Sequence, residues 1–261
     1  MSPLTAIVLA CLSGGVLSIL AAAGTLALHP RWISSLVSFA VGALLGAVFL
    51  ELLPHALEEG RPAYVMATVL AGLLLFFLLE KLVLWRHSHG NDETGQPTEH
   101  AGHSHGAGIV YEGRAGLMIL IGNSVHNFCD GIVIAAAFLT NFALGTATAF
   151  AIVAHAIPQQ VGDFAILLHS GYARRRAFAF NVATGLATLA GGLLGFLALA
   201  TMKDLLPTVL AVAAASLLYV AVADLIPSLH RHPAPRATAL QLLLICIGVG
   251  LIAVVHQWLE P

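Results

Sequence analysis

LIGNSVHNFCDGIVIAAAFL (residues 120–139) and FAIVAHAIPQQVGDFAILL (residues 150–168) are two apolar stretches, and each carries polar residues near its middle. Of the 261 residues in the chain, 59% are hydrophobic and only 9% are charged, and the mean hydropathy is +0.91. Soluble domains carry about 25% charged residues. Long apolar runs in such a chain predict membrane-spanning helices. The composition therefore indicates an all-α, polytopic membrane protein.

Eight transmembrane helices are predicted, and most of the connections between them are short and carry Pro, Gly or charge. The spans cover residues 4–28, 32–57, 63–85, 115–139, 145–170, 177–200, 204–229 and 237–258. The one long connection, residues 86–114, is polar and rich in Gly and His. A loop of this length and composition is expected to lie outside the membrane. We expect residues 1–261 to form a single transmembrane domain that includes this His-rich loop.

The basic residues predict the orientation of these spans. Nine of the eleven Lys and Arg residues fall on one side, and only Arg61 and Lys203 fall on the other. Basic residues are enriched in cytoplasmic loops. Both termini are therefore predicted to lie outside, and the His-rich loop is predicted to lie in the cytoplasm. The expected location is the cell inner (plasma) membrane.

A short internal repeat relates the second and seventh spans. Glu51 stands three residues before Pro54, and Asp224 stands three residues before Pro227. The two spans run in opposite directions, so the pattern predicts a 3+2+3 arrangement with inverted repeats around a central helix hairpin, as transporters commonly have. The alternative is that each Pro only marks the end of a helix.

The two quoted stretches form that central hairpin. A turn near residues 141–144 places Asp130 level with His155, and His126 level with Gln159. A spacing of four also puts each helix's own pair on one face. Ionisable groups at this depth are costly unless they face a cavity, a partner or a metal. Two imidazoles, a carboxylate and an amide oxygen are ligands for a divalent metal.

Neighbouring residues extend these faces. Asp163 continues the His155 face and is expected to be an outer partner of the site. Gly131 and Gly162 are expected to allow close helix packing. A lone His or Asn in a membrane helix is often only an interhelical hydrogen bond. Four groups at matched depth favour a metal site.

The motifs HNFCDG at residues 126–131 and HAIPQQVGDF at residues 155–164 resemble the fourth- and fifth-helix signatures of the ZIP (Zrt-, Irt-like) metal transporters. The resemblance implies an importer of divalent metal, usually zinc and sometimes iron or manganese. It also implies alternating access by movement of one helix bundle against another. By position, the resemblance assigns the transport site to His126, Asp130, His155 and Gln159, and a ligand of an adjacent second site to Asn127.

Two departures from the family pattern concern the metal ligands. Ala156 stands where many members have a carboxylate that serves the second metal, and Gln159 stands where they have His or Glu. The sixth span offers polar residues but no acid in compensation. We therefore predict a single metal site in which Asp130 is the only formal charge. Either its affinity is lower and its turnover faster, or its preferred ion differs.

Further metal-binding residues are expected outside the central hairpin. Glu51 and His55 lie towards the outer end of the second span, with Glu58 and Glu59 at its mouth, and Asp224 lies towards the inner end of the seventh. These are expected along the ion pathway. The His-rich loop offers His87, His89, His100, His103 and His105. Such spacing suits loose binding of transition metals. The loop is therefore expected to sense or to receive metal delivered to the cytoplasm, and the alternative is that it is only a soluble linker.

The predicted function is transport of a divalent transition metal into the cytoplasm. Zinc is the expected ion, and iron, manganese, cobalt and cadmium are alternatives. The expected partners are this ion and the lipid bilayer. A homodimer is left open, and neither nucleic acid nor a catalytic cofactor is expected.

One alternative function is an intramembrane metallohydrolase, which needs a general base beside a metal-bound water. No HExxH motif is present, and Ala156 follows the motif His, so an enzyme is not expected. The other alternative is a metal sensor that no longer transports.

Overall fold

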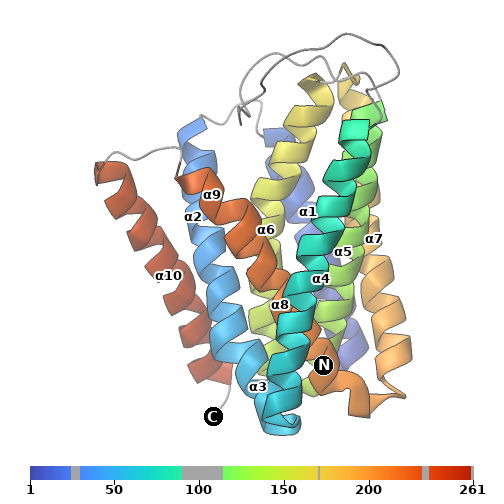
Figure 1. Cartoon of the computed structure of the whole chain (residues 1–261), viewed down its shortest axis with the longest axis vertical. Helices are drawn as coiled ribbons and strands as arrows, with labels where there is room; N and C mark the ends of the chain where they lie inside the picture. Colours follow the sequence, from blue (N-terminus) through green and yellow to red (C-terminus); the bar gives the residue numbers. More distant parts are fainter. Residues whose placement is uncertain (25–29, 90–113, 170, 231–234, 260–261) are drawn as a thin grey trace.

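The computed structural model of the chain describes residues 1–24, 30–89, 114–169, 171–230 and 235–259. These residues form helices joined by short turns (Figure 1). Pro opens several of them, at a position where its missing N–H costs no hydrogen bond. The elements in chain order are α1 (Pro3–Gly24), α2 (Pro30–Gly46), η1 (Ala47–Leu52), α3 (Leu53–Glu59), α4 (Pro62–His89), α5 (Arg114–Thr140), α6 (Phe142–His169), α7 (Arg174–Leu199), η2 (Lys203–Leu205), α8 (Leu206–Tyr219), η3 (Val220–Leu225), α9 (Ile226–Leu229) and α10 (Pro235–Leu259).

The described helices confirm the all-α, polytopic prediction. Among the described residues, seven segments are long and apolar enough to cross a membrane, with α2, η1 and α3 forming one of them and η2 to α9 another. The eighth long helix is α5, whose 27 residues include the polar motif of the first quoted stretch. The predicted loop boundary at residue 86 is wrong, because α4 continues through His89. Residues 90–113 lie outside the described residues.

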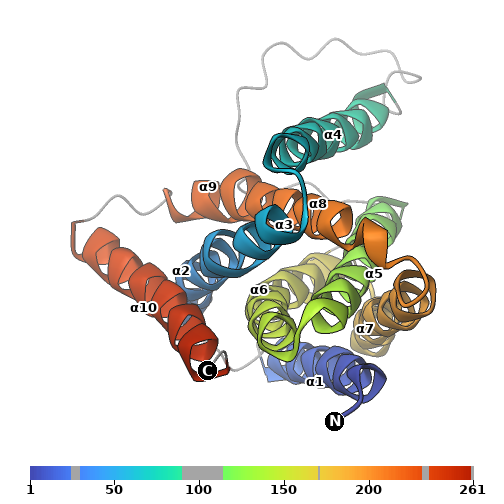
Figure 2. The ribbon, with the colours of Figure 1, turned by 90° about the horizontal axis from the view of Figure 1, so that it is seen from below.

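Two groups of helices are visible when the molecule is seen along the helix axes (Figure 2). The core bundle consists of α1, α5, α6 and α7, and the flanking group consists of α2 with η1 and α3, α4, α8 with η3 and α9, and α10. Within the core bundle, α5 packs against α7 and α1 packs against α6 and α7. In the flanking group, α10 packs on α2 and α4 on α8. The groups meet where α2, η1 and α10 touch α6 and where α8 touches α5.

Glycines set the close packing of α5 on α7. A Cβ atom at Gly131 would overlap the carbonyl oxygen of Thr188, and one at Gly191 would overlap that of Phe128. The prediction for Gly131 is therefore confirmed. The prediction for Gly162 is wrong, since no described residue lies within 4 Å of a Cβ built there.

The two acid-x-x-Pro segments share an unusual local geometry. Glu51 is the fifth of six residues in the π-helical segment η1, and Asp224 is the fifth of six in the π-helical segment η3. Pro54 and Pro227 each follow two residues after the segment ends, and neither can donate the regular backbone hydrogen bond. In Figure 1 the two helices run in opposite directions. This matching geometry supports an inverted repeat, and π-helical turns frequently mark functional positions.

Candidate metal centre

The hairpin between α5 and α6 is tighter than predicted. Asn141 alone joins Thr140, the last residue of α5, to Phe142, the first of α6. A turn at residues 141–144 was expected. The shift moves α6 relative to α5 so that His155 lies opposite both His126 and Asp130 of α5.

Three ligand atoms form a nearly equilateral triangle across this hairpin. Nε2 of His155 lies 3.4 Å from Nε2 of His126 and 3.4 Å from Oδ2 of Asp130, and the third side, from His126 to Asp130, is 3.6 Å. A tetrahedral zinc ion with bonds of about 2.0–2.1 Å holds its ligand atoms about 3.3–3.4 Å apart. The triangle therefore has the size of one face of a tetrahedral metal site, and its fourth corner can take water or a further ligand.

Backbone contacts orient the second imidazole. Nδ1 of His155 lies 3.3 Å from the carbonyl oxygen of Ala151. A carbonyl oxygen only accepts hydrogen bonds, so Nδ1 carries the proton and donates it. This arrangement leaves the lone pair of the neutral ring on Nε2, facing the other two ligand atoms.

Burial makes the site electrostatically demanding. Asp130 and His155 are each 1% exposed, whereas the side chain of His126 is 21% exposed. A carboxylate shielded from water on this scale is costly unless a positive charge or hydrogen-bond donors compensate it. A divalent cation held by these three groups would supply that charge, and His126 is the least buried of the three.

The remaining predicted ligands of the hairpin lie around this triangle. Asn127 is buried and points to α7, where its Oδ1 accepts a hydrogen bond from Thr188 Oγ1 at 3.4 Å. Gln159 is half-buried one helical turn beyond His155. Asp163 accepts a side-chain hydrogen bond from Asn123, further from the turn. The structure thus gathers three of the predicted ligands closely and leaves their neighbours one turn away or on an adjoining face.

A small cavity lies beside the triangle, between α1, α5, α6 and α7. It measures about 10 Å³, room for about one water molecule, and Asn127, Ala156 and Thr188 are among its lining residues. Ser18 Oγ and Gln160 Oε1 are buried at the same cavity without a hydrogen-bond partner among the described residues. All of these groups are uncharged, as expected where Ala156 replaces a carboxylate.

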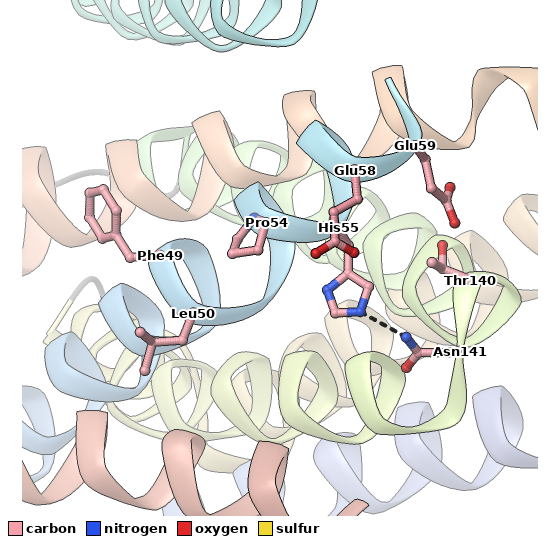
Figure 3. Close-up of a pocket in the computed structure, with 8 residues that line it drawn as sticks. All are labelled: Phe49, Leu50, Pro54, His55, Glu58, Glu59, Thr140 and Asn141. Atoms are coloured by element: carbon pink, nitrogen blue, oxygen red, sulfur yellow. Dashed lines mark hydrogen bonds between the residues drawn. The ribbon is translucent and has the colours of Figure 1, made fainter. Parts of the chain in front are cut away.

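The predicted outer pathway residues lie at the end of the molecule that carries both termini (Figure 1). Glu51 is fully buried in η1, while His55, one turn further on, lines a cavity of about 640 Å³ together with Glu58 and Glu59 (Figure 3). Exposure falls along this line, since Glu58 and Glu59 are exposed and His55 is half-buried.

Several predicted ligands are not described. His87 and His89 belong to the last turn of α4, and only their backbone is described. The side chain of Asp224 and the whole of His100, His103 and His105 lie outside the described residues.

One residue of this region was missed by sequence reasoning. Asn141 was treated only as part of a turn, yet its Nδ2 lies 2.8 Å from Nε2 of His55 and its Oδ1 lies 2.6 Å from the backbone N of Leu144. Asn immediately before a helix is a common N-cap, so the capping role was readable from the sequence. The contact with His55 was not, because the two residues are 86 positions apart.

Comparison with known proteins gives consistent matches over most of the chain. The family model described as "ZIP Zinc transporter" matches residues 3–114 and 86–256. Human zinc transporter ZIP4 is 33% identical over 264 residues, covering 81% of this chain and 41% of that protein. Zinc transporter ZIP13 of Pongo abelii is 33% identical over 83% of this chain and 65% of its own length. The zinc transporter ZIP13 homolog of Drosophila melanogaster is 31% identical over 86% of this chain and 78% of its own length. The chain thus spans between two fifths and two thirds of the first two relatives.

Proposed function

Because the chain belongs to the ZIP zinc transporter family, we propose that it carries a divalent transition-metal ion across a membrane through the triangle of His126, Asp130 and His155. Family membership also agrees with the prediction that the chain is not an enzyme. The observation that carries the proposal is the size and burial of that triangle, whose three ligand atoms all lie within 4.8 Å of one another.

The donor set suits zinc best. Two neutral imidazoles and one carboxylate are ligands that zinc takes readily, at the spacing found here. Iron, manganese, cobalt and cadmium accept some of the same donors, so they compete for such a site. We propose Gln159 as the fourth ligand, since it follows His155 by one turn. An amide oxygen is a weaker zinc ligand than imidazole or carboxylate, which favours release over tight retention.

An ion pathway leads to this site from the end that carries the termini. Glu58 and Glu59 attract cations at the exposed mouth of the cavity, and His55 lies deeper in it. Glu51 is fully buried and lies one helical turn deeper in the molecule than His55. Asp130 is eleven residues before the turn at Asn141, roughly 16 Å along α5. On the far side of the triangle we assign Asp163 and Asp224 to the release path.

Alternating access follows from where the triangle lies. All three ligands belong to α5 and α6 of the core bundle, and η1 of the flanking group packs against α6. Movement of the core bundle past the flanking group carries the ion from the side of Glu51 to the opposite side. The distribution of basic residues favours the cytoplasm as that opposite side, so the direction is import, with both termini outside and the His-rich loop between α4 and α5 inside. We place the chain, as one transporter domain, in the cell inner membrane.

Uptake by purified protein in proteoliposomes tests the proposal. Zinc influx is expected for the wild type and is expected to be lost in His126→Ala, and a panel of iron, manganese, cobalt and cadmium ranks the ions. Zinc binding without influx in the wild type contradicts transport and points to a sensor. Influx unchanged in His126→Ala contradicts the assigned site.

A further inference from the structure

The outer cavity is bounded by two elements from different helix groups. Figure 3 shows His55 of α3, in the flanking group, pointing across the cavity to Asn141 at the turn of the core-bundle hairpin. Nδ2 of Asn141 lies 2.8 Å from Nε2 of His55. This hydrogen bond therefore joins the two groups at the mouth of the proposed pathway.

The tautomer of His55 is fixed by its own helix. Nδ1 lies 2.8 Å from the carbonyl oxygen of Glu51, which can only accept, so Nδ1 carries the proton. Nε2 is then the acceptor for the Nδ2 hydrogen of Asn141. A neutral imidazole has one such lone pair, and it is the pair that a transition metal takes.

Asn141 is anchored to the hairpin through its other side-chain atom. Its Oδ1 accepts the backbone N–H of Leu144 at 2.6 Å and so caps the start of α6. The cap fixes Asn141 to the helix that carries His155. His55 follows the π-helical segment η1, whose irregular backbone is a place where a helix can change its path. The hydrogen bond thus connects an irregular segment of one group to a rigid turn of the other.

We propose that the His55–Asn141 hydrogen bond is an outer latch between the two helix groups, and that an arriving divalent metal ion opens it by taking the Nε2 lone pair of His55. Glu58 and Glu59 line the same cavity and supply carboxylate oxygens for the incoming ion. The lone pair serves one partner at a time, so binding of the ion releases Asn141. This role rests on the proposed function, because it assigns to the latch the first step of transport.

Single and double substitutions separate a latch from a merely structural contact. Asn141→Ser keeps a capping oxygen for Leu144 but is too short to reach His55, and Asn141→Thr is a second variant of the same kind. His55→Phe keeps the ring and removes both nitrogens. In zinc uptake, Asn141→Ser is expected to lower KM about fivefold with kcat retained, since one competing hydrogen bond is gone. His55→Phe is expected to raise KM, and adding Asn141→Ser to it is expected to change nothing further.

A binding measurement keeps the latch testable without transport. Co²⁺ absorption is titrated in a His126→Ala background, with and without Asn141→Ser and with and without His55→Phe. Tighter cobalt binding on loss of Asn141, seen only while His55 is present, supports the latch even if the wild type shows no flux. Equal shifts with and without His55, in both uptake and cobalt binding, overturn the latch, as does an unchanged KM and cobalt affinity in both Asn141 variants.

Discussion

Oδ2 of Asp130 on α5 lies 3.4 Å from Nε2 of His155 on α6, and both side chains are shielded from water. The carboxylate is the only formal charge among the three gathered ligands. The affinity of the site for a divalent ion therefore depends on this one group more than on either imidazole.

Asp130→Asn is expected to abolish zinc uptake and to weaken zinc binding by at least about 100-fold. Removing a residue that only hydrogen-bonds to a metal ligand weakens binding by about 10- to 100-fold, and removing the charge of a ligand itself is expected to cost at least as much. The substitution keeps the shape of the side chain and removes its charge. Isothermal titration of the detergent-solubilised protein gives the affinity. Asp204→Asn, at an exposed position in η2, is the matched control and is expected to retain wild-type affinity. Wild-type binding by Asp130→Asn excludes the carboxylate as a ligand.

The contact between α5 and α7 predicts a difference between two glycines. Gly131→Ala places a methyl group against the carbonyl of Thr188, which must move, and we expect a loss of about 1–3 kcal/mol in stability. Gly162→Ala meets no atom of the described residues within 4 Å and gains helix propensity of about 1 kcal/mol. Thermal unfolding in detergent, followed by circular dichroism, is expected to rank Gly162→Ala above the wild type and Gly131→Ala below it. An equal midpoint for the two variants contradicts the packing assigned to Gly131.

The sequence was informative about each helix on its own and less so about how helices meet. A period of 3.6 residues reports which side chains share one face, so the spans and the faces of His126 and His155 were readable. The length of the hairpin turn could not be read from the sequence. Because the turn consists of Asn141 alone, α6 is displaced along α5 relative to the prediction, and this displacement decides which residues lie opposite each other. Close approach also depends on the neighbouring helix. For that reason Gly131 and Gly162 looked alike in sequence but differ in the fold.

Local backbone chemistry explains a second difference. Pro54 and Pro227 signalled helix ends or kinks, whereas the structure has continuous helices with π-helical turns before each Pro. In both, the residue just before the Pro donates its N–H to the carbonyl five residues back, Leu53 to Val48 and Ile226 to Ala221. The chain thus accommodates the missing donor of Pro by widening one turn.

The His-rich loop is predicted to regulate transport and not to be required for the movement of the ion itself. Replacing His100, His103 and His105 with Ser keeps the length and polarity of the connection and removes the imidazoles. We expect zinc uptake in proteoliposomes to keep its initial rate at low internal zinc. The dependence of that rate on preloaded internal zinc is expected to weaken. Uptake abolished at all internal concentrations contradicts a regulatory role, and an unchanged dependence on internal zinc favours a plain linker.

The uncharged cavity next to the triangle predicts one bound ion per chain. Asn127, Ala156 and Thr188 offer no carboxylate there, and a second divalent ion a few ångströms from the first requires one to offset the repulsion. Ala156→Glu supplies the charge, and the zinc content of the purified protein is expected to rise from one to two equivalents by elemental analysis. Ala156→Gln has nearly the same volume without the charge and is expected to stay at one. Two equivalents in the wild type, with Asn127 bridging into the second ion, contradict the single-site prediction. If Ala156→Glu and Ala156→Gln both stay at one equivalent, the missing carboxylate at position 156 is not what limits the site.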